Sequence, residues 1–199
     1  MKLSILICTM PERSQMFNTL KVKILNQIEK AKTNEVEVLS NDRLDITTGE
    51  KRNLLLAQSK GDFIVFVDDD DDVYEYYVAE IVDTINKNPN IDCIGTNGII
   101  SFNGQNARQW FISISYKYWY ESGEIYYRTP NHISPIRREI AIGIGFPNQH
   151  HGEDFEYSMS ILPHLHKEAI IEKPLYHYKS RAALNPQVEN GAPYRPAWR

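Results

Sequence analysis

Five consecutive aspartates, at positions 68–72, are the residues whose type and spacing point most directly to chemistry. They follow the apolar run 63–67 (Phe-Ile-Val-Phe-Val), whose β-branched and aromatic residues predict a buried strand. Carboxylates packed this closely repel one another unless a cation neutralises them, and a divalent metal with oxygen ligands is the simplest such cation. The alternative is a solvated acidic loop. Because the run adjoins a predicted core strand, we favour the metal-binding interpretation.

Two further features carry residue types suited to catalysis. Gly152 precedes Glu153 and Asp154 at the start of an apolar helical pattern, so two carboxylates are expected at a helix N-terminus. Acidic residues also favour that position for electrostatic reasons alone. His177 lies in a short predicted strand near the end of the chain, where it is either a metal ligand or a packed strand histidine.

The elements that must position these residues alternate between strands and helices in the first half of the chain. Thr47 and Glu50 form a capping-box signature that opens one of the helices. Strands are predicted at 2–8, 35–39, 63–67 and from 91–94 onward, and helices at 14–30, 47–60 and 74–87. This order predicts an α/β fold with a mostly parallel sheet flanked by helices. Ligands bind beyond the carboxyl ends of the strands in such sheets, where the aspartates are expected.

The second half of the chain is less regular. Aromatic residues crowd the segment 108–120, which we interpret as a strand of a small antiparallel extension. Its rings either pack in the core or line a cleft that stacks on a sugar or a base. Short helices are predicted at 138–144 and 153–162 and a last strand at 173–179. Proline and glycine mark the end of the chain, which divides it into a domain of residues 1–184 and an irregular tail of residues 185–199.

The composition limits the class of protein. With 199 residues and a net charge of −4, the chain is expected to form one globular domain that does not coat nucleic acid. It has no apolar stretch long enough to span a bilayer and no clear signal peptide, so we expect a cytoplasmic protein. Cys8 and Cys93 fall in predicted buried strands, which favours free thiols over a disulfide.

The order of these motifs resembles that of GT-A fold glycosyltransferases, in particular the inverting glycosyltransferase family 2. The resemblance covers about residues 3–180. It begins with 4–13 (Ser-Ile-Leu-Ile-Cys-Thr-Met-Pro-Glu-Arg), which resembles the strand and turn that approach the nucleotide. It continues through Asn41-Asp42, Gly-Glu-Lys-Arg-Asn at 49–53 and the Asp-x-Asp-Asp-like stretch 68–71, and ends with Gly-Glu-Asp at 152–154 and a late histidine.

The resemblance implies a Rossmann-like GT-A domain that moves a sugar from a nucleotide-diphosphate sugar, here expected to be UDP-linked, to an acceptor hydroxyl with inversion. It implies that Asp154 is the catalytic base and that Glu153 orients the donor or the acceptor. Asp70 would bind Mn²⁺ or Mg²⁺ against the diphosphate, and His177 would complete the metal shell. A glycan is the first expectation for the acceptor, while a nucleic acid stays among the alternatives.

The donor pocket implied by the resemblance draws on several segments. Thr9 and Asp42 would contact the base, Arg52 would lie against the nucleotide and Asp68 would face the ribose. Together with Glu153, the residues implied to bind the nucleotide-sugar are Thr9, Pro11, Arg13, Asp42, Arg52, Asp68 and Asp69.

Three points stay open at the level of the sequence. The chain has Asn41-Asp42 where the family commonly has an Asp-Asp pair, so the base contact can shift by one residue. The metal ligand is Asp70 or one of its neighbours Asp69 and Asp71. His132 either lines the acceptor site or fills a turn.

Two other classes of protein share some of these features. A sugar-phosphate nucleotidyltransferase has a similar sheet order but requires a glycine- and arginine-rich loop after the first strand, where this chain has Thr-Met-Pro-Glu-Arg. A non-enzymatic, divalent-ion-dependent carbohydrate-binding module would use the aspartates and the aromatic rings without a nucleotide pocket. The sugar, the acceptor and the oligomeric state are not determined by the sequence.

Overall fold

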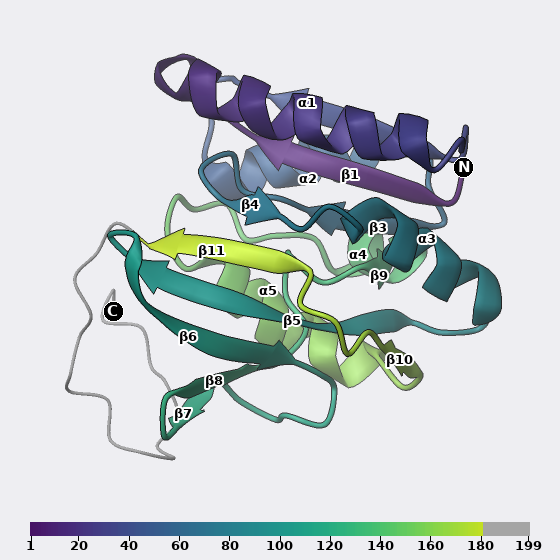
Figure 1. Ribbon diagram of the computed structural model, residues 1–199, viewed down its shortest axis with the longest axis vertical. Coiled ribbons are helices and arrows are strands. Elements are labelled where there is room, and N and C mark those ends of the chain that lie inside the picture. The colour runs from purple at the N-terminus through teal and green to yellow at the C-terminus, as the bar shows by residue number, and fades with distance from the viewer. Residues whose placement is uncertain (181–199) are drawn as a thin grey trace.

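The computed structural model describes residues 1–180 of the chain. The predicted boundary at residue 184 and the predicted tail 185–199 lie outside the described residues. Figure 1 shows the expected alternation of strands and helices in the first half. Its elements are β1 (Leu3–Cys8), a 3-10 turn (Pro11–Arg13), α1 (Ser14–Lys30), β2 (Val36–Asn41), α2 (Thr48–Gln58), β3 (Phe63–Phe66), β4 (Asp72–Val73) and α3 (Tyr77–Lys87).

The second half contributes the remaining strands and two short helices. Its elements are β5 (Cys93–Phe102), β6 (Gln105–Ile112), β7 (Tyr120–Ser122), β8 (Ile125–Arg128), β9 (Ile136–Arg137), α4 (Arg138–Ile144), α5 (Glu153–Ile161), a 3-10 turn (Leu162–His164), β10 (Glu168–Ile170) and β11 (Tyr176–Ser180). The single strand predicted at 108–120 is wrong in extent, because β6 ends at Ile112 and a turn leads to β7. The helix predicted from residue 74 begins three residues later, at Tyr77, because a turn separates β4 from the helix.

The sheet confirms the predicted α/β class, with a parallel centre and antiparallel additions. Its strand order is β2-β1-β3-β9-β5-β6-β8-β7, and β11 pairs with both β4 and β5. β1 lies parallel to β2 and to β3, whereas the short β9 runs antiparallel between β3 and β5. The carboxyl ends of β1, β2 and β3 therefore lie at one edge of the sheet.

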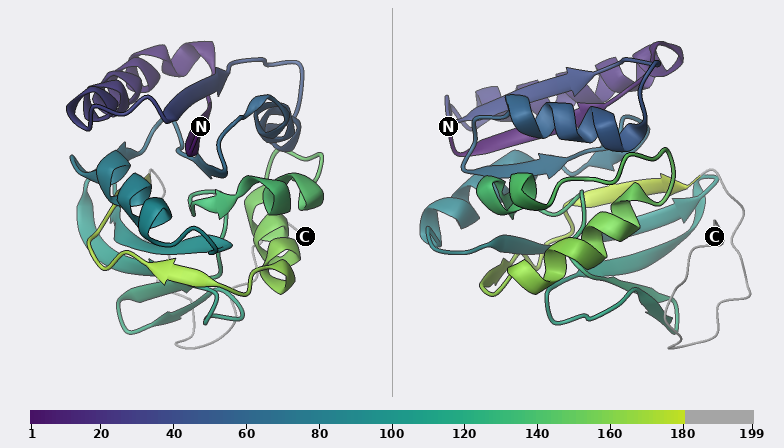
Figure 2. Two further views of the ribbon diagram at one scale, coloured as in Figure 1. Left: turned by 90° about the vertical axis from the view of Figure 1, so that its right-hand side faces the viewer. Right: turned by 180° about the vertical axis from the view of Figure 1, so that it is seen from behind.

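Two hydrophobic clusters occupy the two faces of this sheet. Alternate residues of β3 belong to different clusters. Phe63 and Val65 pack with α1 and α3, whereas Ile64 and Phe66 pack with α2, α4 and α5. Figure 2 shows α1 and α2 on opposite faces of the sheet. Because both faces are covered, the central strand β3 is apolar and buried along its whole length.

The structure also bears on the expectations for the two cysteines, the aromatic segment and membrane crossing. Cys8 and Cys93 are both free thiols, as predicted. Trp110 is buried in the core, while Tyr120 and Tyr127 stack with ring centroids 4.8 Å apart where β7 pairs with β8. Within residues 1–180, no helix has the length and apolar character that crossing a membrane requires.

Candidate active site

The candidate site lies beyond the carboxyl ends of β1 and β3. These strands are parallel neighbours with Leu6 opposite Phe66, so Thr9 and Asp68 emerge at the same edge of the sheet. The acidic run then turns sharply, and the N–H of Asp71 donates to the carbonyl of Asp68 at 3.2 Å. The acidic run is therefore tied to the end of a core strand, as predicted.

Asp69 and Asp70 hold the loop that follows β1. Thr9 Oγ1 donates to one oxygen of Asp69 at 2.8 Å, and Arg13 Nη1 donates to the other at 2.9 Å. Asp69 is only 3% exposed, so both of its oxygens are used within the protein. The same guanidinium group lies 3.1 Å from Asp70, whose side chain keeps 21% of its surface exposed. Of these two aspartates, Asp70 is the one that a ligand can reach.

Asp68 lies between a guanidinium group and an imidazole. Arg52 Nη2 is 3.3 Å from Asp68 Oδ1, and His132 Nε2 is 3.1 Å from Asp68 Oδ2. Burial opposes the charge of Asp68, but His132 and Arg52 outweigh it and hold the pKa of this carboxyl well below its usual range. Asp68 is therefore a carboxylate that accepts hydrogen bonds at physiological pH.

Arg52 is a buried cation, 4% exposed, on the second helix. Its guanidinium carbon lies 5.1 Å from the ring centre of Phe66 and 5.4 Å from that of Phe146. Its Nε lies 3.4 Å from Glu153, which completes an ion-pair chain from Asp68 to the start of α5. Nε and Nη1 make no hydrogen bond to the described residues, so these nitrogens retain donor capacity in the site.

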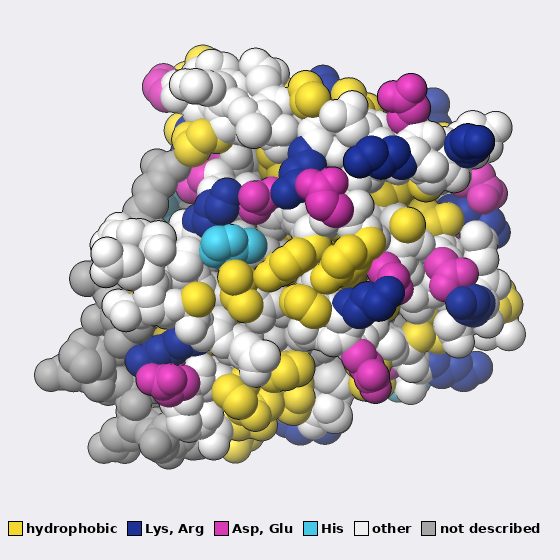
Figure 3. Space-filling view, in the orientation of Figure 1, with side chains coloured by type: hydrophobic (Ala, Val, Ile, Leu, Met, Phe, Trp, Pro, Cys, Tyr) yellow, Lys and Arg dark blue, Asp and Glu magenta, His cyan; other side chains and the backbone are white. Residues whose placement is uncertain are grey.

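The last two aspartates of the run face different partners. Tyr176 and the backbone N–H of Lys179 donate to Asp71 at 2.8 and 2.7 Å. Burial, and secondarily the charge of Asp68, raise the pKa of Asp71 to about 8 despite these hydrogen bonds. Asp72 instead pairs with Lys23 and Lys179. Figure 3 shows acidic and basic side chains gathered beside a histidine on this face of the molecule.

Glu153 and Asp154 begin α5, as predicted. Gly152 precedes them with φ 78°, a left-handed conformation that favours glycine, and this turn directs the chain into the helix. Glu153 is 6% exposed, and burial raises its pKa above the usual value although Arg52 partly opposes the shift. Asp154 is more open, with 28% of its side chain exposed, and its Oδ1 accepts from the N–H of Phe155 at 2.8 Å. Asp154 is thus a carboxylate within reach of a substrate.

The Gly-Glu-Lys-Arg-Asn motif explains how α2 supports both sides of the site. Lys51 is buried, and its Nζ donates to the carbonyl of Thr9 at 2.9 Å. Asn53 exchanges two hydrogen bonds with the backbone of Phe146, each 2.8 Å long. The N–H of Gly49 donates to the carbonyl of Gln149 at 3.1 Å. The helix therefore fixes the loop after β1 and the loop that leads to Asp154.

His132 is the central residue whose role the sequence left open. It is 6% exposed and lies between the two halves of the site, with Nε2 against Asp68 and Nδ1 4.0 Å from Asp154 Oδ2. Tyr176 and Lys51 also take part although sequence reasoning did not select them. Lys51 lies inside a motif that was selected, and Tyr176 is the strand neighbour of a selected histidine. In the sequence, their position within or beside a selected motif is the one signal that could have pointed to a role for these two residues in the site.

The predicted metal ligands are placed apart. Side chains alternate across a strand, and the Nε2 of His177 lies 2.8 Å from Ser101 Oγ, away from the face on which Tyr176 contacts Asp71. Among residues 1–180, no three His, Cys, Asp or Glu side chains are arranged to hold a metal ion. Mg²⁺ and Mn²⁺ often take one or two carboxylates together with substrate phosphates, and the partly exposed Asp70 fits that pattern. His177 does not fit it in this arrangement.

The other predicted nucleotide contacts lie at the rim of the site. Asp42 follows β2 and is exposed. The N–H of Thr9 donates to the carbonyl of Asn41 at 2.9 Å, so the segments after β1 and β2 run side by side. Pro11 opens the exposed 3-10 turn that carries Arg13. The structure thus brings Thr9, Arg13, Arg52, Asp68, Asp69, Asp70, Glu153 and Asp154 to one region, with Asp42 and Pro11 at its edge and His177 on another face.

Solved structures with the same fold include three crystal structures of residues 1–349 of S. aureus TarS. The free form has a TM-score of 0.61 at 17% identity and covers 90% of this chain and 60% of that one. The complex with UDP-GlcNAc has a TM-score of 0.62 at 17% identity, and the match covers 92% of this chain and 60% of the TarS chain. The complex with UDP has a TM-score of 0.62 at 18% identity, and the match covers 90% of this chain and 60% of the TarS chain. The chain therefore spans about three fifths of the length of these structures, and the likeness establishes the fold.

The family is established from the sequence side. A search among curated proteins found no match. The profile of glycosyl transferase family 2 matches residues 21–145, which include α2, Asp68 and His132 and stop short of Asp154. That match covers more than half of the 199 residues. Together with the GT-A architecture and the acidic turn after β3, it identifies the chain as a member of glycosyl transferase family 2.

Proposed function

We propose that this protein transfers a sugar from a UDP-sugar to an acceptor hydroxyl with inversion of configuration. The observation that carries the proposal is the pairing of an acidic turn after β3 with a second, accessible carboxylate, Asp154, at the start of α5. Arg52 and His132 lie between them. Membership of glycosyl transferase family 2 supports the reaction class, and the TarS complexes with UDP-GlcNAc and UDP support a uridine donor.

The donor would lie over the ends of β1 and β3. Thr9, Asp42 and Pro11 would lie on the side of the base, and Asp68 would face the ribose. Arg52 is buried, whereas Arg13 keeps 32% of its side chain exposed beside Asp69 and Asp70, where the diphosphate would lie. Guanidinium groups match phosphate and carboxylate oxygens well, so the partly exposed Arg13 would contact the donor, while the buried Arg52 would lie beneath it and hold Asp68 and Glu153 in place.

Asp70 would hold Mn²⁺ or Mg²⁺. When bound, the ion would supply Lewis-acid stabilisation of the diphosphate leaving group. Asp70 is chemically suitable, because it is a partly exposed carboxylate and Mg²⁺ or Mn²⁺ takes carboxylate oxygens together with substrate phosphates. The ligation by His177 that the resemblance implied would require β11 to change its orientation, so we propose Asp70 alone as the protein ligand.

Asp154 would accept the proton of the acceptor hydroxyl as its oxygen attacks the anomeric carbon. One direct displacement, with the leaving diphosphate on the opposite face of the sugar, inverts the configuration. Glu153 is poorly suited to that role, because it is buried against Arg52. Glu153 would instead fix Arg52 and thereby the donor. We propose a glycan as the acceptor and the cytoplasm as the location.

Titration calorimetry with UDP, GDP and CDP, each with and without Mn²⁺, tests the proposal. We expect one nucleotide, UDP, to bind in a metal-dependent manner, and UDP to be released from UDP-GlcNAc or another UDP-sugar when glycans are screened as acceptors. Binding of glycans with no binding of any nucleotide by folded protein would contradict the proposal. That result would favour the carbohydrate-binding module, whereas production of a nucleotide-sugar from a sugar phosphate would favour the nucleotidyltransferase.

A further inference from the structure

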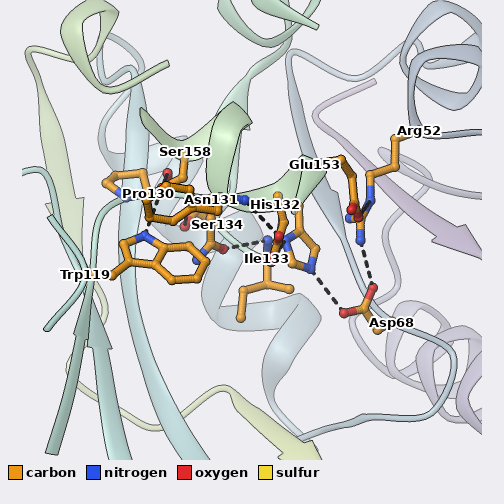
Figure 4. A network of polar contacts seen from close by, with 12 residues as sticks. Arg52, Asp68, Trp119, Pro130, Asn131, His132, Ile133, Ser134, Glu153 and Ser158 are labelled. Atoms are coloured by element: carbon orange, nitrogen blue, oxygen red, sulfur yellow. Dashed lines mark hydrogen bonds and ion pairs between the residues drawn. The ribbon is translucent and has the colours of Figure 1, made fainter. Parts of the chain in front are cut away.

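His132 connects the two carboxylates to which the proposed function gives different tasks. Its Nε2 lies 3.1 Å from Asp68, on the donor side, and its Nδ1 lies 4.0 Å from Asp154, the proposed base. Figure 4 shows the imidazole beside Asp68, with Arg52 joining Asp68 to Glu153. The strand end and the start of α5 are thus connected twice, once through Arg52 and once through His132.

The Nδ1 atom of His132 is buried and makes no hydrogen bond to the described residues. A buried polar atom without a partner costs free energy, so such atoms in native proteins call for an explanation. His132 is 6% exposed, which keeps a substrate hydroxyl away from Nδ1 in this arrangement. The polar group that faces Nδ1 is the Asp154 carboxylate, at a separation slightly too long for a hydrogen bond.

The backbone around His132 is firmly held. Its carbonyl accepts from the N–H of Phe66, the last residue of β3, at 2.8 Å. The side chain of Asn131 accepts from the N–H of Ile133 at 3.1 Å, and Ser158 of α5 donates to the carbonyl of Pro130 at 2.9 Å. The turn that carries His132 is therefore fixed both to the strand before Asp68 and to the helix that bears Asp154.

Asp154 has more freedom than His132. Its Oδ1 accepts from the N–H of Phe155, while Oδ2 is the oxygen that faces His132. A rotation of the carboxylate that moves Oδ2 by about 1 Å would bring it within hydrogen-bond distance of Nδ1. Hydrogen bonds between catalytic groups are often long in ligand-free enzymes and shorten when substrate binds.

We propose that His132 is a positioning residue for the transfer reaction, and this inference rests on the proposed function. In its imidazolium form, in which both ring nitrogens carry a proton, Nε2–H donates to Asp68, and when the donor is bound Nδ1–H donates to Asp154 Oδ2. The base is then held at both oxygens, by Phe155 N–H and by His132, with lone pairs still directed at the acceptor. In the chemical step the acceptor proton passes to Asp154 and the O–H electron pair forms the new glycosidic bond, while the diphosphate leaves; His132 exchanges no proton.

Two amide substitutions separate the two contacts of the ring. An asparagine at position 132 places its amide nitrogen near the position of Nδ1, whereas a glutamine places it near the position of Nε2. His132→Asn therefore keeps a donor toward Asp154, and His132→Gln keeps one toward Asp68. We would measure kcat and donor KM from UDP release with UDP-GlcNAc, or whichever UDP-sugar the calorimetry and acceptor screen select, and compare UDP affinity and thermal unfolding.

The proposal predicts an asymmetric result. His132→Gln should lower kcat by about tenfold or more with little change in UDP affinity, and His132→Asn should retain most of kcat. A structural role would affect both variants alike. Equal losses of kcat in two folded variants, or losses confined to the donor KM, would overturn the proposal. A wild-type protein that neither binds nucleotide nor releases UDP would instead refute the proposed function.

Nitrogen NMR of the histidine rings gives a readout that does not depend on turnover. In UDP-saturated protein, Asp154→Asn should shift the Nδ1 resonance of His132. Glu156→Gln, an exposed acid two residues along the same helix, should not, and the His177 ring serves as an internal reference. An unchanged His132 resonance in the Asp154→Asn protein would overturn the contact even if both variants of His132 failed to fold.

Discussion

The hydroxyl group of Tyr176 joins the two ends of the acidic turn, because it hydrogen-bonds both to the Asp71 carboxylate and to the backbone N–H of Asp68. It donates to Asp71 Oδ2 at 2.8 Å and accepts from the N–H of Asp68 at 3.1 Å. Tyr176 is 1% exposed and belongs to β11, a strand more than one hundred residues away in sequence. The conformation of the proposed donor site is therefore set by a late strand of the chain.

Tyr176→Phe should destabilise the fold by about 1–3 kcal/mol, because it leaves the buried Asp68 N–H and one oxygen of Asp71 without this partner. UDP affinity should fall as well, since the turn that holds Asp68 and Asp70 loosens. Thermal unfolding and calorimetry would measure the two effects. Tyr118→Phe, at a tyrosine that is 43% exposed, is the matched control. A Tyr176→Phe protein as stable as the control would refute the role of this phenol.

Gly49→Ala should disturb the loop that leads to Asp154. A Cβ at Gly49 would lie 1.8 Å from the carbonyl oxygen of Pro147, closer than any real contact. Alanine otherwise favours a helix, so the expected loss of about 1–3 kcal/mol in the free energy of unfolding would come from this clash alone. Gly143→Ala in α4, where a Cβ meets nothing within 4 Å, should be neutral or stabilising. Chemical denaturation of the two variants decides the point, and equal stabilities would contradict it.

The sequence predicted the elements of the first half because their signals are local. The bounds of α1 agree with the predicted 14–30, and Thr47 caps α2 by accepting from the N–H of Glu50 at 3.1 Å, as its capping-box pattern predicted. The acidic run was placed correctly for the same reason, since an apolar strand adjoins it. Hydrophobic periodicity reports on such neighbouring residues directly.

The contacts between distant segments could not be predicted. No local pattern shows that the ring of His132 lies between Asp68 and Asp154, or that Tyr176 rather than His177 faces the acidic turn. The expectation for His177 came from the family resemblance; in the structure its ring contacts Ser101, while its neighbour Tyr176 contacts Asp71. A change of one residue in strand register exchanges the two faces, and that register is fixed by the pairing of β11 with β5.

Asp70→Ala should weaken the metal-dependent part of UDP binding by about tenfold or more, the loss typical of residues that hold or support a metal. The fold should survive, because Arg13 keeps its partner Asp69. UDP titrations over a range of Mn²⁺ concentrations would measure the effect. Asp83→Ala, which removes an exposed ion pair on α3, serves as the control. Unchanged Mn²⁺ dependence in the Asp70 variant would assign the metal to another aspartate.

Asp154→Asn should lower the rate of sugar transfer by about a hundredfold or more, while the affinity for UDP stays nearly unchanged. The amide keeps the shape of the side chain but cannot take the acceptor proton. Glu156→Gln, at an exposed acid in the same first turn of α5, should keep both sugar transfer and UDP binding. A collapse of UDP affinity in the Asp154 variant would show that this residue binds the donor, and full activity would remove it from the mechanism.

Glu168 should make stability depend on pH in a direction opposite to that of a carboxylate whose pKa is lowered by folding. Ser113 Oγ and the N–H of Ile114 donate to it, yet burial dominates and raises its pKa above the usual 4.5. Above pH 4.5 the unfolded chain releases this proton while the folded chain retains it. The contribution of Glu168 to stability is therefore greatest below pH 4.5 and is lost as the pH rises through the raised, folded-state pKa.

Glu168→Gln isolates this contribution, since the variant cannot ionise at that position. The free energy of unfolding of the wild type minus that of the variant should decrease as the pH rises from about 4.5 toward neutrality. Urea denaturation of both proteins across this range would measure the difference, with other titrating groups cancelling between them. A difference that is constant with pH, or that grows as the pH rises, would mean that the hydrogen bonds from Ser113 and Ile114 outweigh burial and that Glu168 ionises with no raised pKa.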